Sequence, residues 1–230
     1  MNKRKIKITE DGSTTLELIG KEEHFHSTHG AIQESEHIFI QNGLYKKANE
    51  LKAISVFEMG FGTGLNALLS LLFAIKNDIC LNYITVEAFP VELDLVDQLN
   101  FPARLQLNAE HKNLFKKLHT SDWNKQIEID PNFIFEKRQI KLEDIEFPQG
   151  AFDLVYFDAF NPDLQPELWT EEIFRKIYGA MKPQGILMTY SAKGKVKRAL
   201  KAAGFSLIAL PGPIGKREIT QAIKKVDNNS

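Results

Sequence analysis

Cysteine is almost missing from this sequence, because Cys80 is the only one among 230 residues. A single thiol excludes an intramolecular disulfide and leaves no thiol pair for redox chemistry. Cys80 stands between Ile79 and Leu81, so the sequence predicts a small buried apolar side chain there rather than a nucleophile.

Long apolar runs are also missing. No uninterrupted apolar stretch approaches the roughly 18 to 20 residues that a membrane-spanning helix needs. The charged N-terminus, which begins Met1-Asn2-Lys3-Arg4-Lys5, is not followed by the apolar core of a signal peptide. We therefore expect a cytoplasmic protein without a membrane partner.

Repeats and low-complexity linkers are absent as well. Hydrophobic residues make up 43% of the chain and charged residues 26%, which is the balance of an ordinary globular protein. This composition excludes collagen-like and wholly disordered chains. We expect an N-terminal extension over residues 1–50, formed by a hairpin and a helix, and one domain over residues 51–230.

The formal net charge of −1 hides an uneven distribution. Residues 176–225 carry eleven lysines and arginines against one acid, Glu218, so their local charge is +10 and the rest of the chain carries −11. Such a segment presents a positive face to a polyanion even when the overall charge is near zero. The alternative is a set of solvated helix faces, and the charge count alone does not decide between the two.

Strand-like and helix-like patterns alternate from residue 54 onward. Compact apolar runs predict strands, and helical periodicity between them predicts helices. The expected strands are 54–59, 82–88, 133–140, 152–157, 186–190, 205–210 and 218–223, with a turn at 183–185. The expected helices are 65–75, 91–99, 171–181 and 195–203, preceded in the N-terminal extension by a hairpin that includes 14–18 and a helix over 30–51.

This alternation implies right-handed crossovers and a sheet covered on both faces. The last two strands are joined through Pro211-Gly212-Pro213 without a helix, so we expect them to pair antiparallel. The expected fold class is α/β, with a doubly wound, mostly parallel seven-stranded sheet and a small N-terminal extension. Ligands of such sheets bind at the carboxyl ends of the strands.

A glycine-rich turn follows the first of these strands, where Glu58 precedes Gly60, Gly62 and Gly64 and the chain opens directly into a helix. Glycines let the backbone come close to a ligand, and the free amides of a helix start favour an anionic group. The Gly-x-Gly-x-Gly spacing differs from the Gly-x-Gly-x-x-Gly of dinucleotide sites. With a carboxylate beside the glycines, it suits a ligand that has an ammonium group and no pyrophosphate, such as S-adenosylmethionine.

Two further acids end strands of the expected sheet. Glu87 closes the second strand, where a carboxylate can accept hydrogen bonds from both hydroxyls of an adenosine ribose, and this favours S-adenosylmethionine over a nicotinamide cofactor. Asp158 ends the fourth strand, next to the first, where the reactive end of the ligand would lie. An amine that accepts a methyl group must first lose a proton, so Asp158 is the candidate catalytic base or the group that orients the amine.

Four segments of the chain resemble one family of tRNA-modifying enzymes. The segments are 57–66 (FEMGFGTGLN), 157–162 with 165–170 (FDAFNP and QPELWT), 189–198 (TYSAKGKVKR) and 215–218 (GKRE). They are similar to the methyltransferase part of the bifunctional tRNA wobble-uridine enzyme MnmC and to its stand-alone MnmD-type relatives. The resemblance implies the class I S-adenosylmethionine-dependent methyltransferase fold.

The resemblance also implies an activity. A methyl group would pass to the primary amine of 5-aminomethyl-(2-thio)uridine at the tRNA wobble position and give 5-methylaminomethyl-(2-thio)uridine. The cofactor residues it implies are Glu58, Gly60, Gly62, Gly64, Asn66, Glu87 and Asp158. The basic residues that fit contacts with tRNA phosphates are Lys193, Lys195, Lys197, Arg198, Lys216 and Arg217.

The chain departs from the family in two places. Relatives commonly carry a Gly-Asp pair after the third strand, whose acid faces the adenine; here residues 137–140 read Lys-Arg-Gln-Ile, and Gln139 is the candidate for that contact. Only residues 224–230 follow the last expected strand, so we expect no flavin-dependent oxidase domain and separate enzymes for the earlier steps of the wobble modification.

Two other classes of function stay open. An aminopropyltransferase, or a small-molecule methyltransferase of the same fold, would use the same glycines and a strand-end aspartate, although aminopropyl transfer to a polyamine predicts acidic surroundings. A non-catalytic RNA-binding module would keep the fold and the basic segment.

One histidine cluster invites a metal interpretation. The His-x-His-x-x-His spacing of His24, His26 and His29 has no cysteine beside it and is more typical of a polar loop than of a metal site, so we expect no metal. The family resemblance places this segment, with Gln33-Glu34-Ser35, near the cofactor as a lid, and the alternative is a surface loop before a helix.

Overall fold

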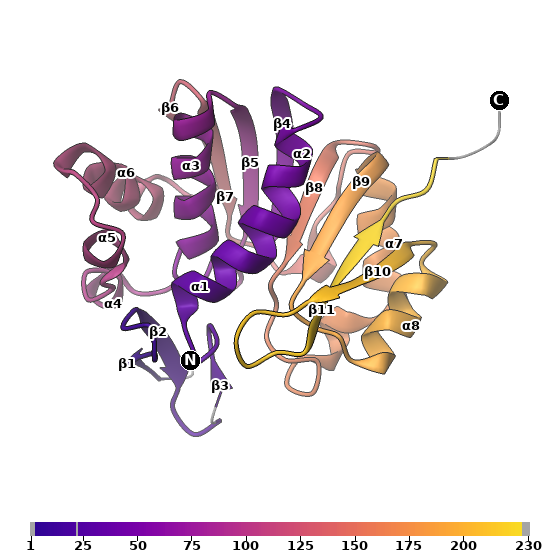
Figure 1. The fold of residues 1–230 in the computed structure, drawn as a ribbon, viewed down its shortest axis with the longest axis horizontal. Helices are drawn as coiled ribbons and strands as arrows, with labels where there is room; N and C mark the ends of the chain where they lie inside the picture. The colour runs from indigo at the N-terminus through magenta and orange to yellow at the C-terminus, as the bar shows by residue number, and fades with distance from the viewer. Residues whose placement is uncertain (1–2, 22, 227–230) are drawn as a thin grey trace.

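The centre of the molecule is a mixed β-sheet. The computed structural model describes residues 3–21 and 23–226. Its central strands are β4 (Ala53–Met59), β5 (Cys80–Val86), β6 (Lys125–Asp130), β7 (Phe133–Arg138), β8 (Phe152–Phe157), β9 (Met181–Thr189), β10 (Ser206–Pro211) and β11 (Glu218–Ile223). Their order across the sheet is β10-β11-β9-β8-β4-β5-β7-β6 (Figure 1).

The middle of this sheet is parallel and its two margins are not. The pairs β4–β5, β4–β8, β5–β7 and β8–β9 are parallel. The last two strands, β10 and β11, pair antiparallel as expected, and β11 with β9 and β6 with β7 are antiparallel as well. The α/β class and the doubly wound arrangement are confirmed, and the number of strands is corrected from seven to eight.

The additional strand is β6, at one edge of the sheet. Its Ile127 and Ile129 alternate with polar residues, which is the pattern of a half-exposed strand. The pairing of β6 with β7 shifts register between Glu128 and Asp130. The alternation of apolar and polar residues that is typical of a strand is therefore present in β6, but with only two apolar residues it is too short to predict a strand within a polar segment.

Three expected boundaries differ in the structure. β9 begins at Met181, and the turn expected at 183–185 is an irregularity inside this strand, where the register to β8 shifts between Phe152 and Leu154. The helix expected at 91–99 is reduced to the single turn α4 (Leu93–Val96). Cys80 is exposed, so the prediction of a buried side chain is wrong, because this residue lies at the very start of β5.

Helices cover both faces of the sheet (Figure 1). One face is packed by α3 (Leu65–Asn77), by α6 (Ala109–Thr120), and by an N-terminal helix made of α1 (Ala31–Ser35), a π-helical part η1 (Glu36–Leu44) and α2 (Tyr45–Ala48). The other face is packed by α7 (Glu171–Ala180) and α8 (Gly194–Ala202). Successive strand residues alternate between the two cores, so Val56 belongs to the first and Phe57 to the second.

A small antiparallel sheet lies beside the main one. It consists of β1 (Arg4–Ile8), β2 (Thr14–Leu18) and β3 (Glu23–His24). The Arg4 guanidinium donates hydrogen bonds to the carbonyl oxygens of Phe89 and Pro90, in the loop that follows β5. The remaining helical turns are α5 (Phe101–Arg104), η2 (Leu142–Asp144) and η3 (Pro166–Trp169). Across the residues that the structure describes, no helix combines the length and the apolar character that crossing a membrane requires.

Gly64 supports the fold by a close contact. It has a positive φ of 71°, and a Cβ at this position would lie 2.7 Å from Nε2 of the buried His119. Gly20 also has a positive φ, 86°, but a Cβ there would meet nothing within 4 Å. Alanine at either position would therefore strain the backbone, but only alanine at position 64 would also collide with a neighbouring side chain.

We expect Gly64→Ala to lower the free energy of unfolding more than Gly20→Ala. The left-handed backbone costs about 1 to 2 kcal/mol for alanine at either site, and the clash with His119 adds about 1 kcal/mol or more at position 64. Urea unfolding of both variants measures the difference. Equal losses would show that His119 simply moves aside.

Candidate active site

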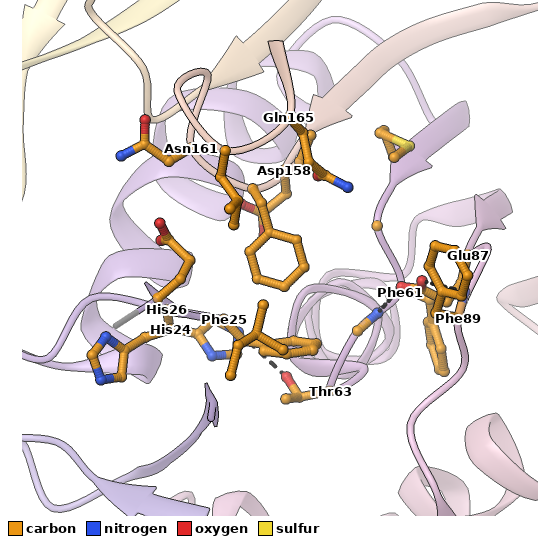
Figure 2. A pocket seen from close by; sticks show the side chains of 18 of the residues that line it. His24, Phe25, His26, Phe61, Thr63, Glu87, Phe89, Asp158, Asn161 and Gln165 are labelled. Atoms are coloured by element: carbon orange, nitrogen blue, oxygen red, sulfur yellow. Dashed lines mark hydrogen bonds between the residues drawn. The ribbon is translucent and has the colours of Figure 1, made fainter. Parts of the chain in front are cut away.

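A cavity of about 830 Å³ opens at the carboxyl ends of β4, β5 and β8. The small N-terminal sheet contributes to its wall through Arg4, Leu18 and Glu23. A cavity of this size at this edge of a doubly wound sheet suits a nucleoside-sized ligand. Figure 2 shows side chains from the N-terminal segment and from the strand ends pointing toward its interior.

The glycine loop forms part of the cavity wall. Gly60 and Gly62 line it, with positive φ values of 93° and 49°. A Cβ on Gly60 would lie 2.8 Å from the carbonyl oxygen of Asp158, so only glycine allows β4 and β8 to end this close together. Gly64 is not among the lining residues, and its contact is with His119 on α6.

Glu87 lies on the cavity wall directly after β5. Its carboxylate accepts hydrogen bonds from the backbone N–H groups of Gly62, at 3.1 Å, and Phe89, at 2.9 Å (Figure 2). Burial raises the pKa of Glu87 above its usual value, and the hydrogen bonds from backbone N–H groups oppose that shift. The carboxylate is held in place while each oxygen keeps a free lone pair that can accept from a ligand hydroxyl.

Asp158 lies at the end of β8 and also lines the cavity. The Asn66 side chain on α3 donates from Nδ2 to Oδ2 of Asp158 at 2.9 Å. Burial raises the pKa of Asp158 to about 7, the Glu34 carboxylate adds to this, and Asn66 and Lys216 oppose it. A carboxyl group with a pKa near neutrality can both take up and release a proton under cellular conditions.

Glu58 is brought beneath the cavity rather than into it. The side chain is fully buried and is not among the lining residues. Burial raises its pKa to about 8, although Thr85, Asn66 and Tyr83 lie around the carboxyl group and lower it. The structure therefore places Glu58 in the core under α3 and not in the cavity wall, where the sequence predicts it.

Gln139 does not reach the cavity either. The residue is exposed, and its backbone N–H donates to Oδ1 of Asn124 at 3.1 Å. The segment that does line the cavity is the next one along the chain, Ile140 to Glu143. The structure therefore does not bring Gln139 to the cavity, and the lining residues Ile140 and Leu142 are apolar and give no polar signal in the sequence.

The structure pairs most of the expected RNA-binding residues with acids. Lys193 and Lys195 both contact Asp163, Lys197 contacts Glu218, and Lys216 contacts Glu34. Among the described residues, Arg198 and Arg217 form no ion pair and are exposed. A shallow hollow next to the main cavity is lined by Lys193, Lys216 and Arg217 together with their neighbours.

The three histidines point to different partners. His24 contacts Glu17, His29 contacts Glu10, and His26 lies between the hydroxyl groups of Thr15 and Thr63. Within residues 3–21 and 23–226, no group of three or more potential ligands has the arrangement of a metal site. The cavity wall includes all three, as Figure 2 shows for His24 and His26.

Comparison with known proteins gives a consistent picture. Residues 103–225 match the model of a family described as S-adenosyl-L-methionine-dependent methyltransferase. The chain is 30% identical over 196 residues to the tRNA 5-methylaminomethyl-2-thiouridine biosynthesis bifunctional protein MnmC of Campylobacter hominis, covering 82% of this chain and 28% of that protein. It is 30% identical over 214 residues to the MnmC protein of Pseudomonas savastanoi pv. phaseolicola, with 85% and 31% covered. The chain thus spans less than a third of the length of these two relatives.

Solved structures with the same fold include two that superimpose over nearly the whole chain. MNMC2 from Aquifex aeolicus has a TM-score of 0.80 at 24% identity, covering 98% of this chain and 71% of that one. Spermidine synthase from Thermotoga maritima has a TM-score of 0.56 at 16% identity, covering 99% and 71%. At these identities the likeness establishes the fold alone.

The raised pKa of Glu58 predicts a pH-dependent stability. The folded protein keeps the Glu58 proton up to a pKa of about 8, whereas the usual value is 4.5. The folded state therefore binds more protons, and this contribution to the free energy of unfolding falls as pH rises between those two values. Glu58→Gln stays neutral at every pH and removes this fall.

We expect the wild type to lose about 1 kcal/mol or more of unfolding free energy, relative to Glu58→Gln, when the pH rises from about 5 to about 8. Urea titrations at the two pH values measure it. The same difference at both would mean that the buried carboxyl group is already ionised at the lower pH.

Proposed function

The chain belongs to the S-adenosyl-L-methionine-dependent methyltransferase family whose model it matches, and from this we propose that it methylates the primary amine of 5-aminomethyl-(2-thio)uridine at the tRNA wobble position. The MnmC relatives are named for the biosynthesis of tRNA 5-methylaminomethyl-2-thiouridine, and they suggest this substrate. The observation that carries the proposal is the convergence of Glu87, the glycine loop and Asp158 on one cavity. In this proposal other enzymes produce the aminomethyl arm.

The residues of the cavity fit S-adenosylmethionine. Glu87 is fixed by two backbone N–H groups and can still accept the two ribose hydroxyls, and Gly60 and Gly62 leave room for the ligand next to the backbone. Ile140 and Leu142 offer an apolar surface for the adenine ring. The cofactor supplies a methyl group bonded to a positively charged sulfur, which makes the methyl carbon open to attack by a nucleophile.

Asp158 prepares the substrate amine in this proposal. An alkylammonium must lose a proton before its nitrogen lone pair is free, and Asp158, with a pKa of about 7, can accept that proton. With Asp158 holding that proton, the nitrogen lone pair would be free for the methyl group that S-adenosylmethionine would supply. The hydrogen bond from Asn66 fixes the carboxylate so that one oxygen remains available to the amine.

The basic surface next to the cavity suits the anticodon backbone. Arg198 and Arg217 are exposed, and Lys193, Lys195 and Lys197 lie close by. We assign these residues to tRNA phosphates, with the paired lysines exchanging Asp163 and Glu218 for phosphate when tRNA binds.

We expect Glu87→Ala to weaken S-adenosylmethionine binding at least tenfold, because two hydrogen bonds to a charged acceptor, about 1.5 to 3 kcal/mol each, are lost. Glu92→Ala is the matched control, since Glu92 lines the same cavity but is exposed and pairs with Arg4. Isothermal calorimetry measures both dissociation constants. Equal effects in the two variants would remove Glu87 from the ribose site.

The direct test of the function is transfer of labelled methyl groups to tRNA that carries the aminomethyl arm. We expect the wild type to form methylaminomethyluridine, detected by mass spectrometry of nucleosides. Asp158→Asn should keep S-adenosylmethionine binding within a few-fold and lose about 10² or more in turnover, the usual scale for a lost general base. If the wild type binds the cofactor yet leaves the arm unchanged, the substrate is a different molecule.

A further inference from the structure

An ion pair built from distant parts of the chain lies in the cavity wall. Glu34 comes from α1, and Lys216 from the loop between β10 and β11. Lys216 Nζ is 2.8 Å from Oε1 of Glu34 and 4.2 Å from the centre of the Tyr190 ring. All three residues line the same cavity as Asp158. An alkylammonium group of the protein thus occupies a position between a carboxylate and an aromatic face.

The two members of this pair are held very differently. Glu34 is buried, and its Oε2 accepts a hydrogen bond from the backbone N–H of Ser27 at 2.7 Å. Lys216 has a long flexible side chain that is 28% exposed, against 10% for Glu34. The carboxylate is therefore a fixed part of the wall, whereas the ammonium is carried by a flexible, partly exposed side chain that can turn toward solvent.

We propose that Glu34 and the Tyr190 ring form the subsite for the substrate's ammonium group, and that Lys216 occupies this subsite until the substrate displaces it. This assignment rests on the proposed function, because it identifies how the aminomethyl arm is recognised. A carboxylate together with an aromatic face binds an alkylammonium by charge-assisted hydrogen bonding and by the cation–π interaction.

The exchange keeps every buried charge paired. Removing Lys216 alone would leave the Glu34 carboxylate buried without a counter-ion, which is costly, but the incoming ammonium replaces it with the same charge. Lys216 also lines the neighbouring hollow with Lys193 and Arg217. The displaced lysine can therefore turn from Glu34 to an RNA phosphate without leaving its loop.

The subsite also gives a basis for choosing among wobble arms. An uncharged arm gains nothing from Glu34, and an arm that ends in a carboxylate is repelled by Glu34 and by the ionised form of Asp158. Both carboxylates act on the same cavity, since the Glu34 charge raises the pKa of Asp158 and Lys216 lowers it. A primary ammonium is the group that satisfies Glu34 and then meets Asp158 as the base.

The test compares two dissociation constants in the presence of S-adenosylhomocysteine, so that no transfer occurs. One is for tRNA that carries the aminomethyl arm, and the other for the same tRNA with an unmodified wobble uridine. We expect the wild type to prefer the arm about tenfold or more, the effect of one charged hydrogen bond. Glu34→Gln should lose this preference, because it removes the charge that pairs with the arm, and it should still bind S-adenosylhomocysteine.

Glu10→Gln is the matched control, because Glu10 also comes from the N-terminal segment and pairs with His29 but does not line the cavity. It should keep the preference. Glu34→Asp keeps the charge and should restore part of the preference if Glu34→Gln folds poorly. Lys216→Met should leave the preference equal or larger, since no ammonium has to be displaced. A smaller preference would overturn the displacement.

The outcomes separate this inference from the proposed function. A wild type that does not methylate aminomethyl tRNA contradicts the function itself. A wild type that methylates it, with an arm preference that Glu34→Gln retains, leaves the function intact and shows that Glu34 does not bind the ammonium.

Discussion

The close approach of β4 and β8 at Gly60 is the constraint on which the site depends. The N–H of Gly60 donates to the carbonyl of Val86 at 3.0 Å, and the N–H of Asp158 donates to the carbonyl of Met59 at 3.1 Å, so the ends of β4, β5 and β8 are joined at one level. A side chain at Gly60 would collide with the Asp158 backbone. Separating the strands would take Asp158 from Asn66 and Gly62 from Glu87, so the proposed base and the proposed ribose acceptor would be displaced together.

A second consequence of this geometry is a set of polar side chains under α3. Strand alternation places Glu58 on β4 and Tyr83 on β5 on the face that α3 covers, with Asn66 above them. Loss of water raises the pKa of Glu58 to about 8 and that of Asp158 to about 7. Burial thus has two effects. It makes the folded state less stable at alkaline pH, because Glu58 is buried in its protonated form, and it raises the pKa of Asp158 to near neutrality.

The sequence predicts those parts of the site that follow from local pattern and from strand ends. Gly60, Gly62, Glu87 and Asp158 come directly after apolar runs, and parallel strands bring their carboxyl ends to one edge. The orientation of a side chain depends on distant packing, so the sequence places Gln139 and Glu58 at the ligand, whereas the structure has neither in the cavity wall. The role of Gly64 depends on where α6 packs His119. The contact between Glu34 and Lys216 joins α1 to the loop between β10 and β11. These segments are far apart in the sequence, so no residue spacing predicts the contact.

Many of the basic residues in the last third of the chain are paired with acids in the structure. A charge count treats each lysine as free, but Lys193 and Lys195 share Asp163, which lies outside the basic segment, and Lys216 is held by Glu34. A polyanion that binds here must replace these carboxylates, so each contact exchanges one ion pair for another. Such an exchange gains less energy than a new ion pair, because the cation was never free, and its strength falls as salt rises. The proposed substrate fits this surface, because a tRNA with an aminomethyl arm would bring phosphates together with a cation for the carboxylate of Glu34.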